Sequence, residues 1–446
     1  MSSLKKLAIR GAVWTFIGYG LSQGLRFISN LILTRLLVPE LFGLMALVNT
    51  FIIGLTLFSD IGINPSIIQN KRGDDPDFLN TAWTIQVIRG FGLWFACLLI
   101  AWPVAHVYGD SRLLWLIPIL GLNTIVSGFN STNIPTLNRH MEIGKLTLLE
   151  LGVQIITLTV MNVWAWLNPT IWALVGGTLV SGIVKMIWSH RLIPEMINRF
   201  TWDKTAIQEI FSFGRWIFMS TAMTFLSDQS DKLILGKLFS LQMLGVYTIA
   251  FTLADIPRQI SIKLGNSVIF PVISKQLDLP RQTLRVKILQ KRRLILLGAG
   301  ILLIVMVSCG DFLILALYDE RYKQAAWMMP ILSLALWHTL LYNTMSPALI
   351  AVGKPLYGAQ GNVLRFLTLV VGLPLGFSLF GILGAVLVVA FSDVPLYLVM
   401  MYGLWREGLS CIGEDIKVTT LFIGCLSIVL IGRYLLGFNL PIADIL

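Results

Sequence analysis

Charged residues are scarce in this chain of 446 residues. Asp, Glu, Lys and Arg together make up 13% of it, and 56% of its residues are hydrophobic. Soluble domains carry about 25% charged residues, so this chain has too little charge to cover a water-exposed surface of its size. That excludes a soluble enzyme, a disordered chain and a secreted disulfide scaffold. The mean hydropathy of +0.79 predicts a polytopic α-helical membrane protein.

Residues that build catalytic and metal sites are equally sparse. The cysteines show no CxxC spacing and the histidines stand far apart, at Cys97, Cys309, Cys411, Cys425, His106, His140, His190 and His338. This spacing favours neither a disulfide framework nor a metal centre. The sequence has no HExxH, Walker A or GxGxxG motif, and no loop long enough for an ATPase domain. We therefore expect a protein that is not an enzyme and has no cofactor or metal.

Long apolar runs are what the sequence does contain. Thirteen of them are long enough to cross a hydrocarbon layer of roughly 30 Å. In lipid the backbone must satisfy its own hydrogen bonds, which makes these runs helices. The predicted spans are 12–37, 44–68, 81–105, 113–137, 146–167, 170–193, 211–238, 244–273, 294–317, 327–352, 356–379, 382–405 and 417–436.

The distribution of Lys and Arg predicts the orientation. Most of the 34 basic residues lie in the N-terminal tail and in every second loop. The remaining loops hold only Arg35, Arg112, Lys237, Arg321 and Lys323. Basic loops stay in the cytoplasm, so we expect a cytoplasmic N-terminus. This asymmetry explains the net charge of +11 without a nucleic-acid partner.

The basic segment 281–293 fits either an amphipathic helix on anionic lipid or a solvated loop.

Two stretches of the sequence resemble each other. Residues 30–43, NLILTRLLVPELFG, align with 232–245, KLILGKLFSLQMLG, and 115–120, WLIPIL, align with 327–332, WMMPIL. An internal duplication of six spans explains both matches and predicts two halves related by an axis along the membrane normal, with a cavity between them. We expect one six-helix bundle over residues 1–200, a second over 201–410 and an additional transmembrane helix in 411–446.

Basic residues also lie inside the predicted spans, where each costs at least about 2.5–3.5 kcal/mol at mid-bilayer. They are Arg26, Arg89, Lys185, Arg215, Lys232, Arg258, Lys263 and Arg365. Lys232 lies one helical turn from Asp228 and next to Asp231, and Asp255 lies near Arg258, so we expect ion pairs at both places. Basic residues outnumber acidic ones within the spans. Such a surplus suits an anionic substrate, and the planar guanidinium group of Arg suits a phosphate.

Polar residues in several spans share one helical face. They are Tyr19, Gln23, Arg26 and Asn30; Asn49, Thr56, Asp60 and Asn64; Asn123, Ser127 and Asn130; Glu150, Gln154 and Thr157; and Asp255, Arg258, Gln259, Lys263 and Asn266. Two interpretations fit these stripes. They form hydrogen bonds between helices, worth about 0.6 kcal/mol each, or they line a polar cavity.

Several segments resemble a known family. LILTRLLVPELFG, SDIGINPSIIQNKRGDDPDFLNTAW (59–83), NPTIWALVGGTLV (168–180) and the blocks within 213–274 are similar to the bacterial polysaccharide transport proteins, the Wzx-type oligosaccharide flippases of the colanic-acid branch. The resemblance implies the fold of the multidrug/oligosaccharidyl-lipid/polysaccharide superfamily, two six-helix bundles in a MATE-like V. It also implies a place in the bacterial inner membrane and twelve or fourteen helices. Relatives use cavity arginines on the diphosphate, and Arg26 resembles one of these.

The resemblance implies a flippase. It would move an undecaprenyl-diphosphate-linked oligosaccharide from the inner to the outer leaflet by alternating access, for exopolysaccharide, capsule or O-antigen synthesis. We expect Arg26, Arg89, Arg258 and Arg365 to clamp the diphosphate, and amides of the spans 44–68, 113–137 and 244–273, among them Asn64 and Asn130, to bind sugar hydroxyls. Lys263, Gln23 and Asn30 are further expected substrate contacts, and Asp60 and Glu150 are candidate proton or ion-coupling sites. Membrane lipids, a polysaccharide polymerase and chain-length proteins are the expected partners. The alternatives are a lipid II flippase, a drug/cation antiporter of the same fold, and a non-transporting scaffold of the assembly machinery.

Overall fold

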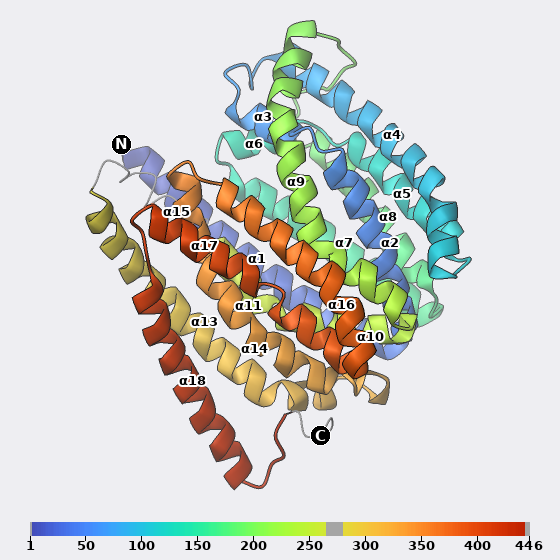
Figure 1. Cartoon of the computed structure of the whole chain (residues 1–446). Helices are drawn as coiled ribbons and strands as arrows, with labels where there is room; N and C mark the ends of the chain where they lie inside the picture. Colours follow the sequence, from blue (N-terminus) through green and yellow to red (C-terminus); the bar gives the residue numbers. More distant parts are fainter. Residues whose placement is uncertain (1, 265–279, 442–446) are drawn as a thin grey trace. The chain divides into compact units, whose positions relative to one another are not determined.

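The computed structural model describes residues 2–264 and 280–441, and helices make up its regular structure there (Figure 1). Contacts divide the chain into two compact units, Met1–Phe225 and Leu226–Leu446. Each unit is described by itself below. The sequence-based boundary between the two bundles, at residue 200, remains a prediction.

Unit 1 contains helices that run back and forth across its length. They are α1 (Ser2–Leu36), α2 (Pro39–Phe58), α3 (Ile63–Gln69), α4 (Pro76–Tyr108), α5 (Leu113–Gly128), α6 (Asn133–Arg139), α7 (Ile143–Leu167), α8 (Ile171–His190) and α9 (Lys204–Leu238), whose last turns belong to unit 2.

Unit 2 contains the remaining helices. They are α10 (Leu241–Ala254), α11 (Ile256–Leu264), α13 (Arg281–Leu317), the short 3₁₀ helix η2 (Glu320–Tyr322), α14 (Ala325–Asn343), α15 (Ser346–Ala351), α16 (Leu356–Phe391), α17 (Val394–Arg406) and α18 (Ile412–Leu435).

These helices confirm a polytopic α-helical membrane protein. In the described part of the chain, eight helical segments are long and apolar enough to cross a membrane, and nine if the bent pair α5–α6 counts as one span. Every one of the thirteen predicted spans overlaps a helix. The number falls short of thirteen because α1, α9 and the 14-residue α10 are not among these segments and because 356–406 counts as a single segment.

That last segment contains a sharp reversal of the chain. Phe380 and Gly381 leave the helical conformation, and Gly381 has a φ of 59°, which only glycine adopts at little cost. A Cβ added at Gly384 would lie 1.9 Å from the carbonyl oxygen of Gly376. Residues eight positions apart touch only if the chain turns back on itself. The predicted spans 356–379 and 382–405 are therefore two antiparallel helices.

Several spans are broken rather than continuous. Gly62, with a φ of 66°, separates α2 from α3, and α5 and α6 are bent by 58°. In unit 2 the break between α10 and α11 falls at Asp255, and the break before α17 falls at Asp393. Each break leaves backbone groups that lipid cannot satisfy, so side chains or water must meet them. The breaks are thus the places where polar residues are needed inside the membrane.

Helix boundaries repeat along the chain. α1 ends at Leu36 and α9 at Leu238, and α2 begins at Pro39 and α10 at Leu241, so both pairs are 202 positions apart. Farther along, α5 and α14 begin 212 positions apart, and each has a proline at its sixth position. Equal offsets of this kind are what an internal duplication leaves behind.

The basic segment 281–293 is neither a separate surface helix nor a solvated loop. It forms the first turns of α13, whose Leu284 and Ile288 pack into the core of unit 2. Arg292 in the same stretch is buried and forms an ion pair with Asp415 of α18. At the other end of α13, Asp311 pairs with Arg433. These two buried pairs fix α18, the helix outside the repeat, to unit 2.

Candidate functional site: a polar cavity in unit 1

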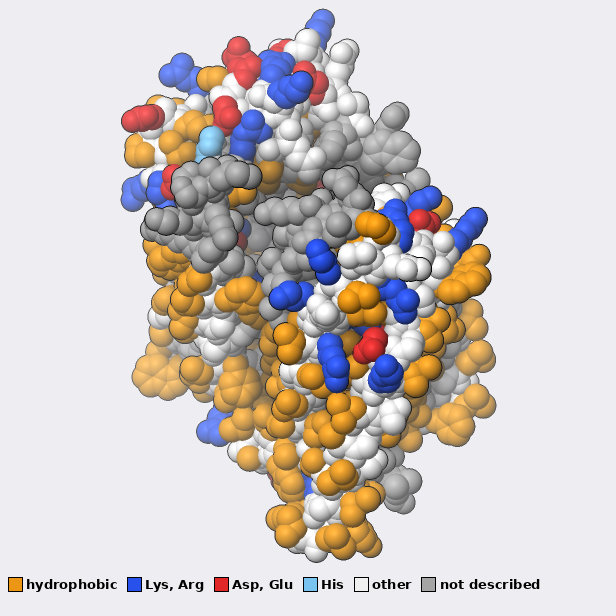
Figure 2. Space-filling view, turned by 90° about the vertical axis from the view of Figure 1, so that its left-hand side faces the viewer, with side chains coloured by type: hydrophobic (Ala, Val, Ile, Leu, Met, Phe, Trp, Pro, Cys, Tyr) orange, Lys and Arg blue, Asp and Glu red, His pale blue; other side chains and the backbone are white. Residues whose placement is uncertain are grey.

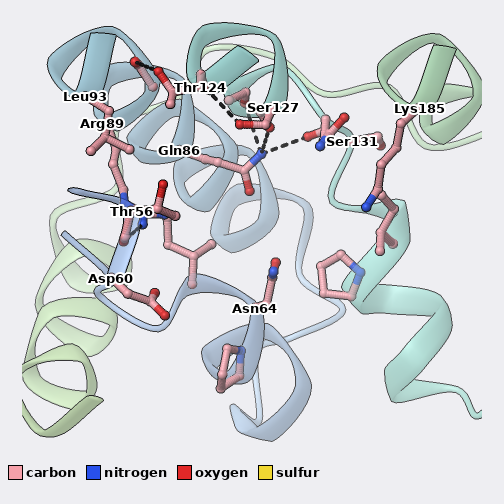
Figure 3. Close-up of a pocket in the computed structure, with 17 residues that line it drawn as sticks. Thr56, Asp60, Asn64, Gln86, Arg89, Leu93, Thr124, Ser127, Ser131 and Lys185 are labelled. Atoms are coloured by element: carbon pink, nitrogen blue, oxygen red, sulfur yellow. Dashed lines mark hydrogen bonds between the residues drawn. The ribbon is translucent and has the colours of Figure 1, made fainter. Parts of the chain in front are cut away.

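The breaks of α2–α3 and α5–α6 meet at one cavity of about 260 Å³ in unit 1 (Figure 3). α4 and α8 complete its wall. Its polar lining consists of Thr56, Asp60, Asn64, Gln86, Arg89, Thr124, Ser127, Asn130, Ser131 and Lys185. Four of the predicted site residues, Asp60, Asn64, Arg89 and Asn130, are therefore brought together here.

Arg89 comes from the middle of α4 and reaches the broken end of α2. Its Nε donates to the Ser59 hydroxyl at 3.0 Å, and its Nη2 donates to the Thr56 carbonyl oxygen at 2.6 Å. A helix C-terminus leaves carbonyl oxygens without partners and carries partial negative charge, so a guanidinium group fits there. Both protein partners of Arg89 are neutral. Its Nη1 has no partner among the described residues, which leaves donors for a ligand in the cavity.

Gln86, one turn before Arg89, does the same for the end of α5. Its Nε2 lies within hydrogen-bond distance of the carbonyl oxygens of Ser127, Gly128 and Asn130, at 3.0–3.2 Å. Two side chains of α4 thus hold the broken ends of two other helices. This arrangement explains how irregular backbone can exist at this depth: it lines a cavity and its carbonyl groups are bonded.

The other walls supply one carboxylate, two amides and a second cation. The Asp60 carboxylate accepts from the backbone N–H of Gly62 at 2.9 Å, which fixes it at the α2–α3 break. Asn64 is exposed in α3, and the side-chain oxygen of Asn130 is buried without a hydrogen-bond partner in the structure. Lys185 reaches in from α8, on the side opposite Arg89 (Figure 3). Two basic side chains against one carboxylate give the cavity a surplus of positive charge.

The basic residues of unit 2 have a different environment. Arg365 is buried and forms ion pairs with Asp228 at 2.6 Å and Asp393 at 2.5 Å. Arg258 pairs with Asp255, as predicted, and its Nη1 lies 4.0 Å from Asp228. Each arginine of this network therefore already has a carboxylate partner in this structure.

Little space remains beside this network. The cavity between Arg258, Arg365 and the surrounding helices measures about 30 Å³, room for one or two waters and none for a diphosphate. The prediction that Lys232 forms an ion pair with Asp228 or Asp231 is wrong. Its Nζ donates to Gln229 at 3.0 Å, because Asp228 is taken by Arg365 and Asp231 accepts from the Tyr247 hydroxyl at 2.7 Å.

The other predicted residues lie outside the cavity. Arg26 is exposed on α1, and no ion pair to it occurs among the described residues. Gln23 donates to the Tyr19 hydroxyl at 3.2 Å, and Glu150 is exposed on α7. Asn30 lies on α1 and Lys263 near the end of α11, both half-buried. Asn266 and the side chain of Arg215 lie outside the described residues.

Hydrogen bonds between helices account for part of the polar stripes. Ser22 of α1 and Gln154 of α7 bond each other twice, at 2.6 and 2.8 Å, and Asn162 donates to Ser29 at 2.7 Å. Sequence reasoning noted Lys185 as an intramembrane charge without assigning it to a site, and it missed Gln86. The spacing of Gln86 and Arg89, three residues apart on one helix face, was the available signal.

An ionic cluster outside the spans anchors the segment that precedes α9. Arg72 pairs with Asp75 at 2.7 Å and with Asp203 at 2.8 Å. Hydrogen bonds from the Thr205 side chain and from Arg72 lower the pKa of Asp203 to about 2. The backbone N–H groups of Thr201 and Asp203 donate to threonines of α4 at 3.1 Å. The segment is therefore held on the helix that carries Gln86 and Arg89.

Comparison with protein families gives one match over most of the chain. The family model described as "Polysaccharide biosynthesis protein" matches residues 32–327. The lipopolysaccharide biosynthesis protein WzxC of Escherichia coli (strain K12) is 24% identical over 86% of this chain and 78% of its own length. The teichuronic acid biosynthesis protein TuaB of Bacillus subtilis (strain 168) is 22% identical over 79% and 73%. The succinoglycan biosynthesis transport protein ExoT of Rhizobium meliloti (strain 1021) is 22% identical over 78% and 70%.

Solved structures match the fold over nearly the whole chain. The lipid II flippase MurJ, in an inward closed conformation, superimposes with a TM-score of 0.74 over 97% of this chain and 93% of its own, at 12% identity. A MATE-family multidrug transporter of the MOP superfamily, in an inward-facing conformation, has a TM-score of 0.68 over 89% and 96%, at 14% identity. The predicted MATE-like fold class is confirmed.

Proposed function

Because the chain belongs to the polysaccharide biosynthesis protein family, we propose that it is a flippase for a polyprenyl-diphosphate-linked oligosaccharide. It would carry this precursor from the inner to the outer leaflet of the bacterial cytoplasmic membrane by alternating access. Relatives named for lipopolysaccharide biosynthesis and for succinoglycan transport, and the fold of a lipid II flippase, support a lipid-linked saccharide as the cargo.

The observation that carries the proposal is the charge of the unit 1 cavity. Arg89 and Lys185 face one carboxylate there, and Arg89 has unused donors beside neutral partners. An intramembrane cation that no carboxylate neutralises marks a path for an anionic group. We propose that Arg89 and Lys185 bind the diphosphate, that Asn64 and Asn130 bind the first sugar, and that Asp60 is a proton or ion-coupling site.

Arg26, an exposed basic residue of α1, remains a proposed contact of the diphosphate during transport. Lys263, Arg258 and Arg365, with the amides Gln23 and Asn30, remain predicted substrate contacts. For Arg258 and Arg365 the carboxylate partners would have to be exchanged for phosphate in another conformation. Glu150, exposed on α7, remains a second candidate for ion coupling.

The membrane potential supports outward movement of the substrate. With the N-terminus in the cytoplasm, as the basic loops predict, the inside-negative potential favours sending an anion outward by about 2.3 kcal/mol per charge per 100 mV. A coupling ion is therefore compatible with the proposal and not needed by it. The polyprenyl tail would stay in lipid, because moving it into water costs about 0.8 kcal/mol per CH₂.

Complementation with chemical readout tests the proposal. The chain is expressed in a bacterial strain that lacks its own flippase, and the lipid-linked intermediates are identified by mass spectrometry. We expect the accumulated precursor to disappear with the wild-type chain and to remain with Arg89→Gln and Lys185→Gln. Arg191→Gln, at an exposed position outside the cavity, is the matched control and should complement. Full complementation by both cavity variants would reject the assigned site.

A drug/cation antiporter of the same fold is the main competing function, since MATE transporters share the fold. A cation site needs surplus carboxylates, whereas the unit 1 cavity has surplus cations. The complementation assay separates the two functions, because an antiporter would leave the precursor pool unchanged. A non-transporting scaffold would also leave it unchanged.

A further inference from the structure

An apolar groove runs along unit 2 between α11 and α13. It measures about 380 Å³ and is lined by Pro257, Ile260 and Ser261 on one side and by Leu294, Ile295, Gly298, Ala299 and Leu302 on the other. Ser261 is the single polar residue among the described residues that line it. The groove is separate from the polar cavity of unit 1 and from the ion-pair network, and neither accounts for it.

A glycine keeps the groove open. A Cβ added at Gly298 would meet nothing within 4 Å. Glycine in the middle of a long helix costs stability relative to other residues, and here no neighbouring atom requires it. The missing side chain at this position leaves empty space beside the helix, within a groove of apolar lining that suits an apolar chain.

Basic residues continue the same face of α13 beyond the groove. Lys287 and Lys291 are exposed, and with Leu294, Gly298 and Leu302 they follow the spacing of one helical face. Lys291 and Gly298 are seven positions apart, which corresponds to about 10 Å along the helix axis. Figure 2, in which the left-hand side of Figure 1 faces the viewer, shows Lys and Arg side chains directly beside hydrophobic ones.

We propose that this face is a lateral binding site for a polyprenyl phosphate, with the isoprenoid chain in the α11–α13 groove and the phosphate group at Lys287 and Lys291. The inference rests on the proposed function and names the surface that takes up the lipid part of the substrate. The two lysines and the apolar groove follow one another along α13, just as the phosphate and the hydrocarbon chain follow one another in a lipid phosphate. Because the substrate of the proposed function carries a single isoprenoid chain, we assign that chain to this groove, and a phospholipid acyl chain is the competing outcome of the test.

The position also fits uptake from the inner leaflet. Lys287 and Lys291 lie in the first turns of α13, the end that the basic-loop rule places at the cytoplasmic surface. There the phosphate would meet the lysines while its chain remained at the depth of the groove. The site would hold the lipid part before the diphosphate enters a central path.

Lipid binding to the purified full-length chain tests the site. Native mass spectrometry measures the affinity of undecaprenyl phosphate and, separately, of phosphatidylglycerol. Gly298→Phe fills the groove, and Lys287→Gln with Lys291→Gln removes the charge. We expect each change to lower the affinity for undecaprenyl phosphate at least tenfold, with little effect on phosphatidylglycerol.

Matched controls exist for both changes. Gly424 lies exposed on α18, and a Cβ there also meets nothing within 4 Å, so Gly424→Phe adds the same bulk elsewhere. Arg293→Gln removes an exposed charge on another face of α13. Both controls should bind undecaprenyl phosphate as the wild type does. An equal loss in the controls, no loss with Gly298→Phe, or equal affinity of the wild type for phosphatidylglycerol would overturn the site.

This measurement is separable from the test of the proposed function. Binding is measured without sugar and without transport. If the wild-type chain fails to clear the lipid-linked precursor while Gly298→Phe still abolishes polyprenyl phosphate binding, the transport proposal fails and the groove stands. If transport is intact and Gly298→Phe binds normally, the groove is rejected and the function stands.

Discussion

The ion pairs of Arg365 make a sharp prediction about the role of this residue. Its guanidinium contacts Asp228 and Asp393, and its side chain and that of Asp393 are 11% and 7% exposed. Arg365→Gln leaves Asp393 buried, and within the described part of the chain the Thr339 hydroxyl, at 2.6 Å, is then the one hydrogen-bond donor to its carboxylate. Removing one partner of a buried pair costs about 3–5 kcal/mol. For a unit of this size each kcal/mol shifts the unfolding midpoint by about 2–4 °C, so we expect a loss of roughly 6–20 °C.

Two buried free cysteines provide the assay, because a thiol-reactive dye labels them only on unfolding. Cys97 lies in unit 1 and Cys411 in unit 2, and the exposed Cys309 and Cys425 are first replaced by alanine. Arg365→Gln should lower the midpoint of Cys411 labelling, and adding Asp393→Asn should restore part of the loss, because the uncompensated charge is then removed.

Lys323→Gln, at an exposed position of the same unit, is the control for this assay and should leave the midpoint unchanged. A midpoint for Arg365→Gln within about 2 °C of the wild type, together with lost transport, would refute a structural role. It would make Arg365 a substrate contact, as the sequence predicts.

Three further predictions concern stability. Asp415→Asn leaves Arg292 buried without its counter-charge. We expect the free energy of unfolding to fall by about 3–5 kcal/mol, which would be measured as a lower midpoint temperature of Cys411 labelling than in the wild type. Gly384→Leu places side-chain atoms where a facing carbonyl oxygen lies 1.9 Å from the added Cβ, so the hairpin cannot close and monodisperse protein should be lost on size exclusion. The lowered pKa of Asp203, about 2, gives a stability contribution that is complete above pH 4 and is lost as the pH falls through 2. Arg72→Gln should move that loss to higher pH in a titration of the unfolding midpoint, and an unmoved titration would contradict the ion pair.

The sequence predicted the helices well because hydropathy is a local property. Each predicted span overlaps a helix, and the repeated prolines at 118 and 330 fall at the same position of their helices. It predicted the breaks poorly. Gly62 and Asp255 lie inside the predicted spans 44–68 and 244–273, and Asp255 was expected in an ion pair and not at a break. The segment 281–293 fitted either a surface amphipathic helix or a solvated loop, and its position in the first turns of α13 was not predicted. Whether such a segment is helical depends on packing against neighbours that are distant in sequence.

The site was predicted in part for a similar reason. Helical spacing placed Asp60 and Asn64 on one face, and the cost of burying a charge singled out Arg89, and the structure brings all three to one cavity. Spacing cannot say which stripes meet, and Glu150 and Gln23 do not reach the cavity. Helical spacing also does not predict which carboxylate forms the ion pair with a given intramembrane Lys or Arg. Lys232 is nearer to Asp228 in sequence, whereas Arg365, 137 positions away, takes that carboxylate in the fold.

The two units meet the same physical problem in different ways, and this difference explains which cations remain available. A broken helix in a membrane leaves carbonyl oxygens that need donors. In unit 1 the donors come from α4, where Gln86 is fully used and Arg89 has donors left over beside an open cavity. In unit 2 the break falls at Asp255, whose carboxylate accepts from both Arg258 and Gln259. In this structure Arg258 and Arg365 of unit 2 are therefore paired with carboxylates, whereas Arg89 and Lys185 of unit 1 line a cavity that has a single carboxylate. That surplus of positive charge favours an anion in the unit 1 cavity over the small cavity beside Arg258 and Arg365.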